Sequence, residues 1–228
     1  MSYPIQIENL KFAYDTKVIL DIPSLNIESN SKTMLYGHSG SGKSTLLNLL
    51  CGILQPQSGQ IFIEDTPLHQ LSHQKRDAYR AKHLGVIFQQ FNLIPYLSVL
   101  ENIQLANYFA LNCHRPASDR LESMLKHLGL TQHQLHQRAD ALSIGQQQRV
   151  AIARAFIHQP QLIIADEPTS ALDNHQRDQF IELLLQVAAE NNSTVILVSH
   201  DTNLKQHFSS HIDLHQVNQV QSATGDLS

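Results

Sequence analysis

The sequence predicts an α/β fold in which a helical subdomain interrupts the core. Short apolar runs of strand length recur at residues 33–36, 84–88, 162–165 and 194–198, with helical patterns between them. Such alternation is typical of parallel strands joined by crossover helices. The long block between the second and third runs carries helical patterns, so it is predicted to form a helical subdomain inserted into the core.

The first third of the chain predicts further strands. Apolar and polar residues alternate at 5–12 and 18–27, on either side of a turn at Asp15-Thr16. Residues 59–64 form another strand pattern after a turn marked by Pro and Gly. These segments predict an antiparallel β subdomain beside the core.

Helices are expected where apolar residues recur with helical spacing. These segments are residues 44–50, 74–82, 98–112, 116–128, 144–158 and 174–190. Residues 210–217 instead alternate apolar and polar side chains, which predicts a half-exposed strand with His211 and His215 on its solvated face. We therefore expect these histidines to be surface residues rather than metal ligands.

Composition limits the function classes. The chain has 228 residues and a formal net charge of -4, so it offers no basic field for a nucleic-acid backbone, and no nucleic-acid partner is expected. No apolar run approaches the roughly 18 residues of a membrane-spanning helix. The first residues also lack the basic and then apolar pattern of a secretory signal. We therefore expect a cytoplasmic chain.

A glycine-rich stretch between a predicted strand and a predicted helix carries the strongest chemical signal. It consists of Gly37, His38, Ser39, Gly40, Ser41, Gly42, Lys43, Ser44 and Thr45, which fit the pattern G-x-x-x-x-G-K-[ST] at every fixed position. The alternative is a Gly/Ser-rich turn that merely precedes a core helix. The flanking strand and helix favour the phosphate-binding motif, so the expected ligand is a nucleoside triphosphate.

The chemistry of phosphate binding explains this spacing. Glycines allow successive backbone N–H groups to turn toward phosphate oxygens, and the helix that begins near Gly42 directs its positive end at them. Lys43 is expected to reach the β- and γ-phosphates. The Ser44 hydroxyl is expected to bind the Mg²⁺ that bridges the same two phosphates.

Polar residues follow three predicted core strands, at the sheet edge where α/β folds bind ligands. Asp166 and Glu167 end one strand; Asp166 is expected to organise Mg²⁺, and Glu167 to orient and deprotonate an attacking water. His200 follows another strand and is expected to contact the γ-phosphate or that water. Gln89 follows a third, where its amide can touch Mg²⁺ or the water. Each residue alone is a weak signal, but the glycine loop at the same edge strengthens all of them.

A second helix start lies in residues 142–149. Ser143 provides an N-cap and Gly145 a glycine at the start of the helix, which is a second candidate anion-binding helix N-terminus.

In this order the motifs resemble those of an ATP-binding cassette ATPase, the nucleotide-binding subunit of ABC transporters, over nearly the whole chain. The resemblance makes the glycine loop the Walker A motif, Gln89 the Q-loop glutamine, Asp166 the Walker B aspartate, Glu167 the catalytic base and His200 the switch histidine. It implies a single ABC ATPase domain, with a P-loop NTPase core of about residues 1–88 and 160–228 and a helical subdomain of about residues 90–159.

The resemblance also implies nucleotide contacts outside the glycine loop. These are Ser143, Gly145 and Gln146 in the signature motif, Asp173 in the D-loop (residues 170–173), and Tyr14, whose ring would stack on adenine. The sequence departs from the family at Ile144, where the family usually has the first of two glycines. Since the flanking Ser143 and Gly145 are retained, we expect an active site whose closure is slower or retuned.

The family works as a head-to-tail dimer, with ATP between the Walker A loop of one copy and the signature of the other. The resemblance therefore implies a second copy of this chain and a separate transmembrane permease subunit. It places the chain peripherally on the cytoplasmic face of the inner membrane. The stretch after Gln89 is expected to form the groove that receives a coupling helix of the membrane subunit.

Within the family, residues 85–95 and 100–103 look most like the ATPases of the lipoprotein-releasing, macrolide-exporting and cell-division group. This favours export or mechanotransmission. An importer ATPase remains the alternative, because amino-acid importers carry similar strings. A soluble DNA-repair ATPase would place a long coiled coil between Walker A and the signature, and a P-loop kinase would leave residues 143–146 and 170–173 without a role, so both are less favoured.

Overall fold

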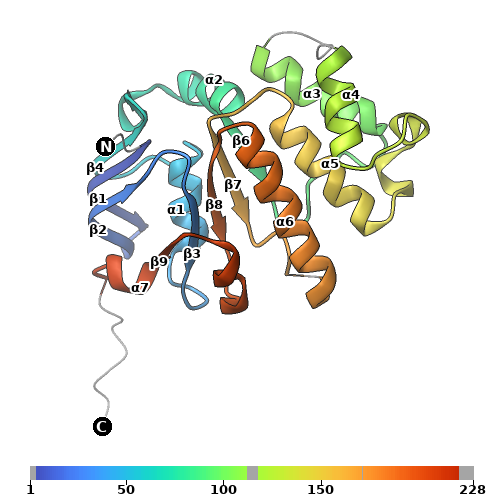
Figure 1. Cartoon of the computed structure of the whole chain (residues 1–228). Coiled ribbons are helices and arrows are strands. Elements are labelled where there is room, and N and C mark those ends of the chain that lie inside the picture. Colours follow the sequence, from blue (N-terminus) through green and yellow to red (C-terminus); the bar gives the residue numbers. More distant parts are fainter. Residues whose placement is uncertain (1–3, 112–117, 171, 221–228) are drawn as a thin grey trace.

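The computed structural model describes residues 4–111, 118–170 and 172–220. Asn112 and Pro116, at the ends of two predicted helices, and Ala171 of the D-loop lie outside the described residues. The described chain forms one parallel and one antiparallel sheet with helices around them (Figure 1). The mixed α/β architecture predicted from the sequence is confirmed.

The parallel sheet has the strand order β6-β7-β8-β3-β9. Its strands are β3 (Lys32–Tyr36), β6 (Leu84–Ile87), β7 (Leu162–Asp166), β8 (Thr194–Val198) and β9 (Ser210–Asp213). Successive residues of a strand point to opposite faces: Ile163 belongs to the core on one face of β7, and Ile164 to the core on the other. Burial on both faces explains why these strands read as continuous apolar runs.

The antiparallel sheet has the order β2-β1-β4-β5. Its strands are β1 (Ile5–Tyr14), β2 (Lys17–Ile27), β4 (Ser58–Ile63) and β5 (Thr66–Pro67). The hairpin of β1 and β2 pairs Tyr14 with Lys17 at its turn. Helix α1 (Lys43–Leu50) buries Leu46 and Leu49 in the core that also contains the inner side chains of this sheet.

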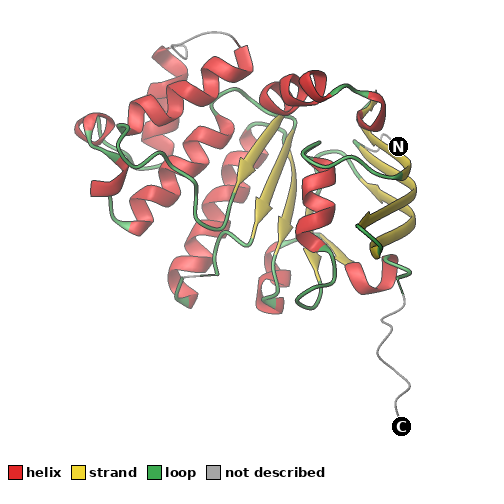
Figure 2. Ribbon diagram, turned by 180° about the vertical axis from the view of Figure 1, so that it is seen from behind, coloured by secondary structure: helices red, strands yellow, loops and turns green. Residues whose placement is uncertain are grey.

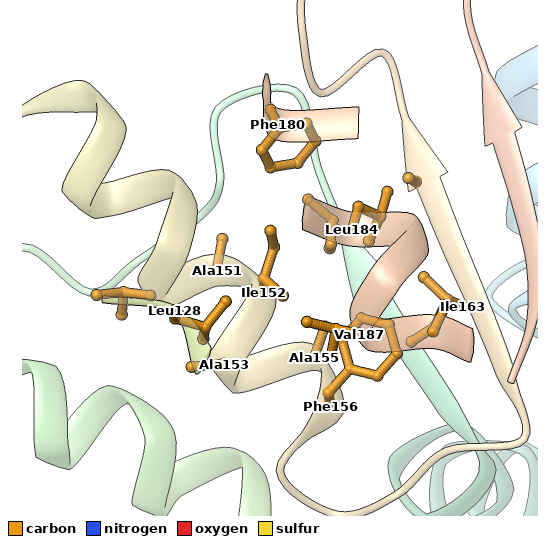
Figure 3. Close-up of a cluster of buried hydrophobic side chains, with 14 of the residues drawn as sticks. Leu128, Ala151, Ile152, Ala153, Ala155, Phe156, Ile163, Phe180, Leu184 and Val187 are labelled. Atoms are coloured by element: carbon orange, nitrogen blue, oxygen red, sulfur yellow. The ribbon is translucent and has the colours of Figure 1, made fainter. Parts of the chain in front are cut away.

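The other face of the parallel sheet is covered by α5 (Ile144–Phe156) and α6 (Asn174–Glu190), whose buried side chains share a core with Ile163. The other longer helices are α2 (His73–His83), α3 (Val99–Leu111) and α4 (Ser118–His127). Figure 3 shows Phe156 of α5 and Val187 of α6 meeting Ile163 of β7. Full burial of side chains of this size contributes about 1.5–3 kcal/mol each, so this contact fixes α5 and α6 on the sheet.

Viewed from behind, the parallel sheet lies between the antiparallel sheet and the helical region that contains α3, α4 and α5 (Figure 2). Short 3₁₀ turns complete the connections at Leu68–Gln70, His133–His136, Ala139–Ala141 and Thr202–His207.

The prediction of a strand over residues 210–217 is wrong in its second half. The strand β9 ends at Asp213, whose carboxylate accepts a hydrogen bond of 3.0 Å from the His215 N–H and starts the short helix α7 (Leu214–Val217). The alternation of apolar and polar residues is therefore produced by a capped helical turn after a short strand. His211 and His215 are both exposed, as expected.

Candidate functional site

The glycine loop runs from the end of β3 into α1. Gly40 and Gly42 have φ angles of +79° and +97°, which other residues adopt only with strain. At Gly42, which immediately precedes α1, a Cβ atom would lie 2.7 Å from Leu20 Cδ2. Leu20 is fully buried in β2, so the antiparallel sheet approaches the loop at a distance that only glycine permits.

The amino-terminal end of α1 faces a cleft. The Leu46 N–H donates to the Gly42 carbonyl at 2.8 Å, whereas the N–H groups of the preceding helical residues, 43–45, point out of the helix end. An anion placed here would accept these hydrogen bonds and be favoured by the helix dipole. The cleft has a volume of about 630 Å³, which is within the range of roughly 300–1,000 Å³ for ligand pockets.

Lys43 supplies positive charge to this cleft. The residue is 7% exposed, and its Nζ donates to the carbonyls of Gly37 at 2.9 Å and His38 at 3.0 Å. The loop backbone thus folds around the ammonium group, which lies among the residues that line the cleft. A phosphate that enters the cleft would meet the Lys43 ammonium group, which the loop backbone already holds in place.

Ser44 and Asp166 form a second group beneath the cleft. Asp166 ends β7, and burial raises the pKa of its carboxyl, as does the charge of the adjacent Glu167. A hydrogen bond from Ser44 and the charge of Lys43 act in the opposite direction on this pKa. A carboxylate and a hydroxyl are oxygen ligands of the kind that Mg²⁺ prefers, and a cation here would relieve the cost of the buried charge, so the two residues fit the metal.

Glu167 and His200 meet at the mouth of the same cleft. The Nδ1–H of His200 donates to Glu167 Oε2 at 2.8 Å, and both residues line the cleft. Glu167 has a φ angle of +44°, and its N–H donates to the Val198 carbonyl at 2.9 Å. This left-handed backbone, which is costly for a glutamate, turns the side chain away from the direction of β7. Strand β8 ends at Val198, shortly before His200, and lies between β7 and β3, so the histidine emerges between the glycine loop and Glu167.

Gln89 is not among the residues that line the cleft. It is exposed in a turn after β6, and β6 is the outermost strand on the far side of β7. The turn continues through Phe91 and Asn92, which have φ angles of +55° and +47°. The guanidinium of Arg154 on α5 donates to the carbonyls of both residues, at 2.6 Å for Asn92. The structure therefore links the Gln89 turn to α5 rather than to the glycine loop.

Tyr14 lies near the cleft without lining it. Its ring is 48% exposed and packs edge-on against Phe12, with 4.9 Å between the ring centroids. Its cross-strand neighbour Lys17 and the nearby Ile19 do line the cleft. Lys17 and Ile19 were not predicted from the sequence, because β2 reaches the cleft only through the packing of the β1–β2 hairpin against the glycine loop.

The amino-terminal end of α5 forms a separate surface. The Ser143 hydroxyl accepts from the Gln146 N–H at 3.3 Å, and the Gln146 side chain accepts from the Ser143 N–H at 2.9 Å. This reciprocal capping box confirms the predicted helix start. Ile144 is 56% exposed, and a Cβ atom at Gly145 would have a neighbour no closer than 3.9 Å. The fold of this chain does not itself require glycine at position 145.

The structure brings together part of the predicted site. The cleft is lined by the predicted residues Ser39, Gly40, Gly42, Lys43, Ser44, Thr45, Glu167 and His200. The predicted residues that are not among its lining residues are Gly37, His38, Ser41, Gln89, Tyr14, Ser143, Gly145, Gln146, Asp166 and Asp173; of these, Asp166 is joined to the lining residue Ser44 by a hydrogen bond. Asp173 instead caps α6 by accepting from the Gln176 N–H at 2.9 Å. A hollow between α4 and α6 is slightly larger than the cleft, at about 660 Å³, and its lining includes Arg120. The Arg120 guanidinium donates to the carbonyls of Phe156 and Ile157, so its role is to stabilise the fold.

The chain matches known proteins along most of its length. A family model described as "ABC transporter" matches residues 20–170. The lipoprotein-releasing system ATP-binding protein LolD of Idiomarina loihiensis is 36% identical over 84% of this chain and 84% of that protein. The putative hemin import ATP-binding protein HrtA of Staphylococcus aureus is 38% identical over 88% of this chain and 89% of that protein.

Solved structures match with similar coverage. The dimeric structure of MJ0796, a bacterial ABC transporter cassette, is 34% identical, covers 92% of this chain and 93% of its own, and superposes with a TM-score of 0.78. A dimeric post-hydrolysis state of the same cassette, bound to ADP and Pi, has the same TM-score of 0.78 at 33% identity. Within residues 4–111, 118–170 and 172–220, no helix is both long and apolar enough to cross a membrane.

Proposed function

This chain belongs to the ABC transporter family of ATP-binding proteins, and on that basis we propose how its residues hydrolyse ATP and which process the hydrolysis drives. The chain is an ATP-binding subunit with ATPase activity. The observation that carries the assignment of residues is the convergence of Lys43, the Ser44–Asp166 group and the Glu167–His200 pair at one cleft.

In this proposal the glycine loop, from Gly37 to Thr45, and the N–H groups at the start of α1 bind the phosphates, and Lys43 contacts the β- and γ-phosphates. Ser44 and Asp166 would hold Mg²⁺, with Gln89 as a further ligand if its turn moves toward the cleft. The ion would supply positive charge that offsets the charge of the phosphates.

Glu167 is the proposed general base. Its carboxylate takes a proton from water as the water oxygen attacks the γ-phosphorus, the bond from that phosphorus to the β-phosphate oxygen breaks, and ADP and phosphate leave. The hydrogen bond from His200 keeps the carboxylate in place and leaves its second oxygen for the water.

The nucleotide site is completed by a second copy of the chain. The matched cassette is dimeric, and we assign Ser143, Gly145, Gln146 and Asp173 to contacts with the nucleotide held by the partner copy. The open space around Gly145 supports this assignment, since close approach from outside the chain explains a glycine that the fold itself does not require. Tyr14 is proposed to stack on adenine at the rim of the cleft.

A separate membrane subunit is the proposed partner in transport. A groove of about 480 Å³ lies between α2, β6, α3 and α5; its lining includes Val86, Phe88, Phe109 and Arg154. Phe109 is 64% exposed. This groove adjoins the Gln89 turn, so a coupling helix of a permease seated in it would act on the cleft through that turn. Docking there places the chain on the cytoplasmic face of the inner membrane.

Export or mechanotransmission is the proposed direction. The support comes from the similarity of residues 85–95 to the lipoprotein-releasing group and from the match to LolD. The match to HrtA, named as a putative importer, makes import the second candidate. We also propose the division into a core of about residues 1–88 and 160–228 and a helical subdomain of about residues 90–159, which is supported by the position of α3, α4 and α5 within the latter range.

The experiment that tests this proposal is Glu167→Gln. The variant keeps the shape of the side chain and a partner for His200, so ATP binding should persist, while loss of a general base lowers turnover by about 10²–10⁴-fold. An ATP-dependent dimer should accumulate on gel filtration. Glu182→Gln, on the exposed surface of α6, is the matched control and should hydrolyse ATP normally. Unchanged turnover in Glu167→Gln would remove Glu167 from the reaction.

The same variant identifies the partner. It is purified with ATP from detergent-solubilised membranes of the source organism, and co-purifying proteins are identified by mass spectrometry. A membrane subunit with a large extracytoplasmic domain supports export or mechanotransmission, whereas an importer permease replaces that direction with import. Recovery of soluble proteins alone contradicts the transport role.

A further inference from the structure

A cluster of charged side chains lies behind the Glu167–His200 pair. It joins the first turns of α6 to the 3₁₀ turn Thr202–His207. Arg177, whose side chain is 10% exposed, donates through Nη1 to Asp201 Oδ2 at 2.5 Å and through Nε to Asp178 Oδ1 at 3.0 Å. Its Nη1 also donates to Asn174 Oδ1 at 3.1 Å. A buried guanidinium with these partners holds two segments of the chain together.

Asp201 is fixed by this cluster from both of its carboxylate oxygens. Oδ2 accepts from Arg177. Oδ1 accepts from the backbone N–H of Asn203 at 3.0 Å and from its side-chain amide at 2.9 Å. The carboxylate therefore cannot rotate without losing a charge-assisted hydrogen bond or the cap of the 3₁₀ turn.

The residue before His200 is also fixed. Ser199 is 3% exposed, and its N–H donates to the Leu35 carbonyl of β3 at 3.2 Å. The Asp201 N–H donates to the Ser199 hydroxyl at 3.1 Å. His200 thus lies between one residue fastened to the strand that enters the glycine loop and another fastened to α6.

His200 needs such support, because its own side chain is 63% exposed. Packing cannot fix a ring that is mostly in solvent, so the direction of its hydrogen bond to Glu167 depends on the backbone that carries it. Loss of the contact from Arg177 to Asp201 would free that backbone on one side.

We propose that Arg177 is a positioning residue for ATP hydrolysis, which acts by holding Asp201 and thereby aims His200 at Glu167. The inference rests on the roles proposed above for His200 and Glu167. The new element is that the roles of His200 and Glu167 depend on the first turns of α6, the helix that Asp173 caps.

The test compares steady-state ATP hydrolysis by the full chain carrying Arg177→Ala, Arg177→Lys, Asp201→Asn or Asp178→Asn. Loss of a group that orients a reacting side chain costs about tenfold or more. We expect kcat to fall about tenfold in Arg177→Ala and Asp201→Asn, with a KM for ATP within about twofold of the parent. Arg177→Lys should recover much of the loss, because it restores a cation beside Asp201.

Asp178→Asn is the matched control. It removes the other carboxylate partner of Arg177 but leaves the contact with Asp201, so its kcat should stay near that of the parent chain. If Arg177→Ala does not fold, Asp201→Asn still tests the same contact, since its remaining oxygen can accept from Asn203. Equal losses in Asp178→Asn and Asp201→Asn would overturn the proposal, as they would show a general effect on folding.

A second comparison uses the His200→Ala background and sensitive detection of released phosphate. If Arg177 acts through His200, Arg177→Ala should cause no further loss there. A further tenfold loss would overturn the positioning role alone and leave the role of His200 intact. If His200→Ala by itself retained full turnover, the proposed role of His200 would fail, and the role of Arg177 with it.

Discussion

Gly42→Ala, compared with Gly40→Ala, tests how the antiparallel sheet shapes the glycine loop. Both glycines have positive φ angles, +97° and +79°. They differ in their surroundings: a Cβ at Gly40 has no neighbour within 4 Å, whereas a Cβ at Gly42 lies 2.7 Å from Leu20 Cδ2 and 3.3 Å from the Ile19 carbonyl oxygen. Leu20 is fully buried, so it cannot swing into solvent.

The expected loss of stability follows from the positive φ angle and from the contact with Leu20. A left-handed backbone costs a non-glycine residue about 1–2 kcal/mol, which both variants incur. Overpacking of a buried site costs about 1–3 kcal/mol more, which only Gly42→Ala incurs. We therefore expect the free energy of unfolding to fall by about 1–2 kcal/mol in Gly40→Ala and about 2–5 kcal/mol in Gly42→Ala. At roughly 2–4 °C per kcal/mol for a chain of this size, the melting temperatures should separate clearly.

The assay is urea and thermal unfolding of both variants, followed by titration with ATP and Mg²⁺. Gly42→Ala should also bind ATP more weakly, because relief of the contact with Leu20 moves the start of α1 relative to the loop. Equal stability of the two variants, or normal ATP affinity in Gly42→Ala, would refute the inference that β2 sets the shape of the loop.

Three further outcomes are expected. Asp166→Asn should abolish hydrolysis yet raise the free energy of unfolding at about pH 7, because burial and Glu167 raise the pKa of this carboxyl above its ordinary 3.8 and make its ionised form costly in the folded state. The gain should vanish in urea unfolding at about pH 3, where the carboxyl is protonated in both states. Tyr14→Ala should weaken ATP binding roughly tenfold, as expected for loss of a stacking contact of about 1–3 kcal/mol, and Tyr14→Trp should retain it in the same titration. Ile144→Gly should raise turnover about twofold or more by opening the approach to Ser143, at a stability cost of about 1 kcal/mol; lower turnover at saturating protein concentration would contradict this.

Local pattern was enough to predict the strands and the glycine loop. The runs at 162–165 and 194–198 are buried on both faces of the sheet, so their apolar character appears directly in the sequence. The glycine loop between a strand and a helix could be predicted because its whole pattern is contained in one continuous stretch. The helical turn at 214–217 was missed, since four residues are too few to display helical periodicity.

Contacts set by strand order could not be predicted in the same way. Glu167 and His200 are 33 residues apart in the chain, and they meet because β8 lies next to β7 in the sheet. Gln89 was expected at the same edge, and it does follow a parallel strand, but β6 is the outermost strand and the turn is held by Arg154. Lys17 reaches the cleft only because two separate sheets pack together, and no local sequence signal describes that packing.

Gly42 and Gly145 both lie at the start of a helix, but a different feature explains the glycine at each position. Gly42 is required by this chain, because Leu20 occupies the space that a side chain would need. Gly145 has no such neighbour, and the adjacent Ile144 is exposed even though it is apolar. Gly145 has no neighbour that requires a glycine, and it lies beside a capped helix start whose residues do not line the cleft. Both features are what the proposed composite site requires of its second half. In the proposed dimer, a second copy of the chain would supply the surface opposite this helix start, and the matched cassette is itself dimeric. It follows that turnover by this chain should depend on its concentration, and that Ile144 should influence the association step more than the affinity of one copy for ATP.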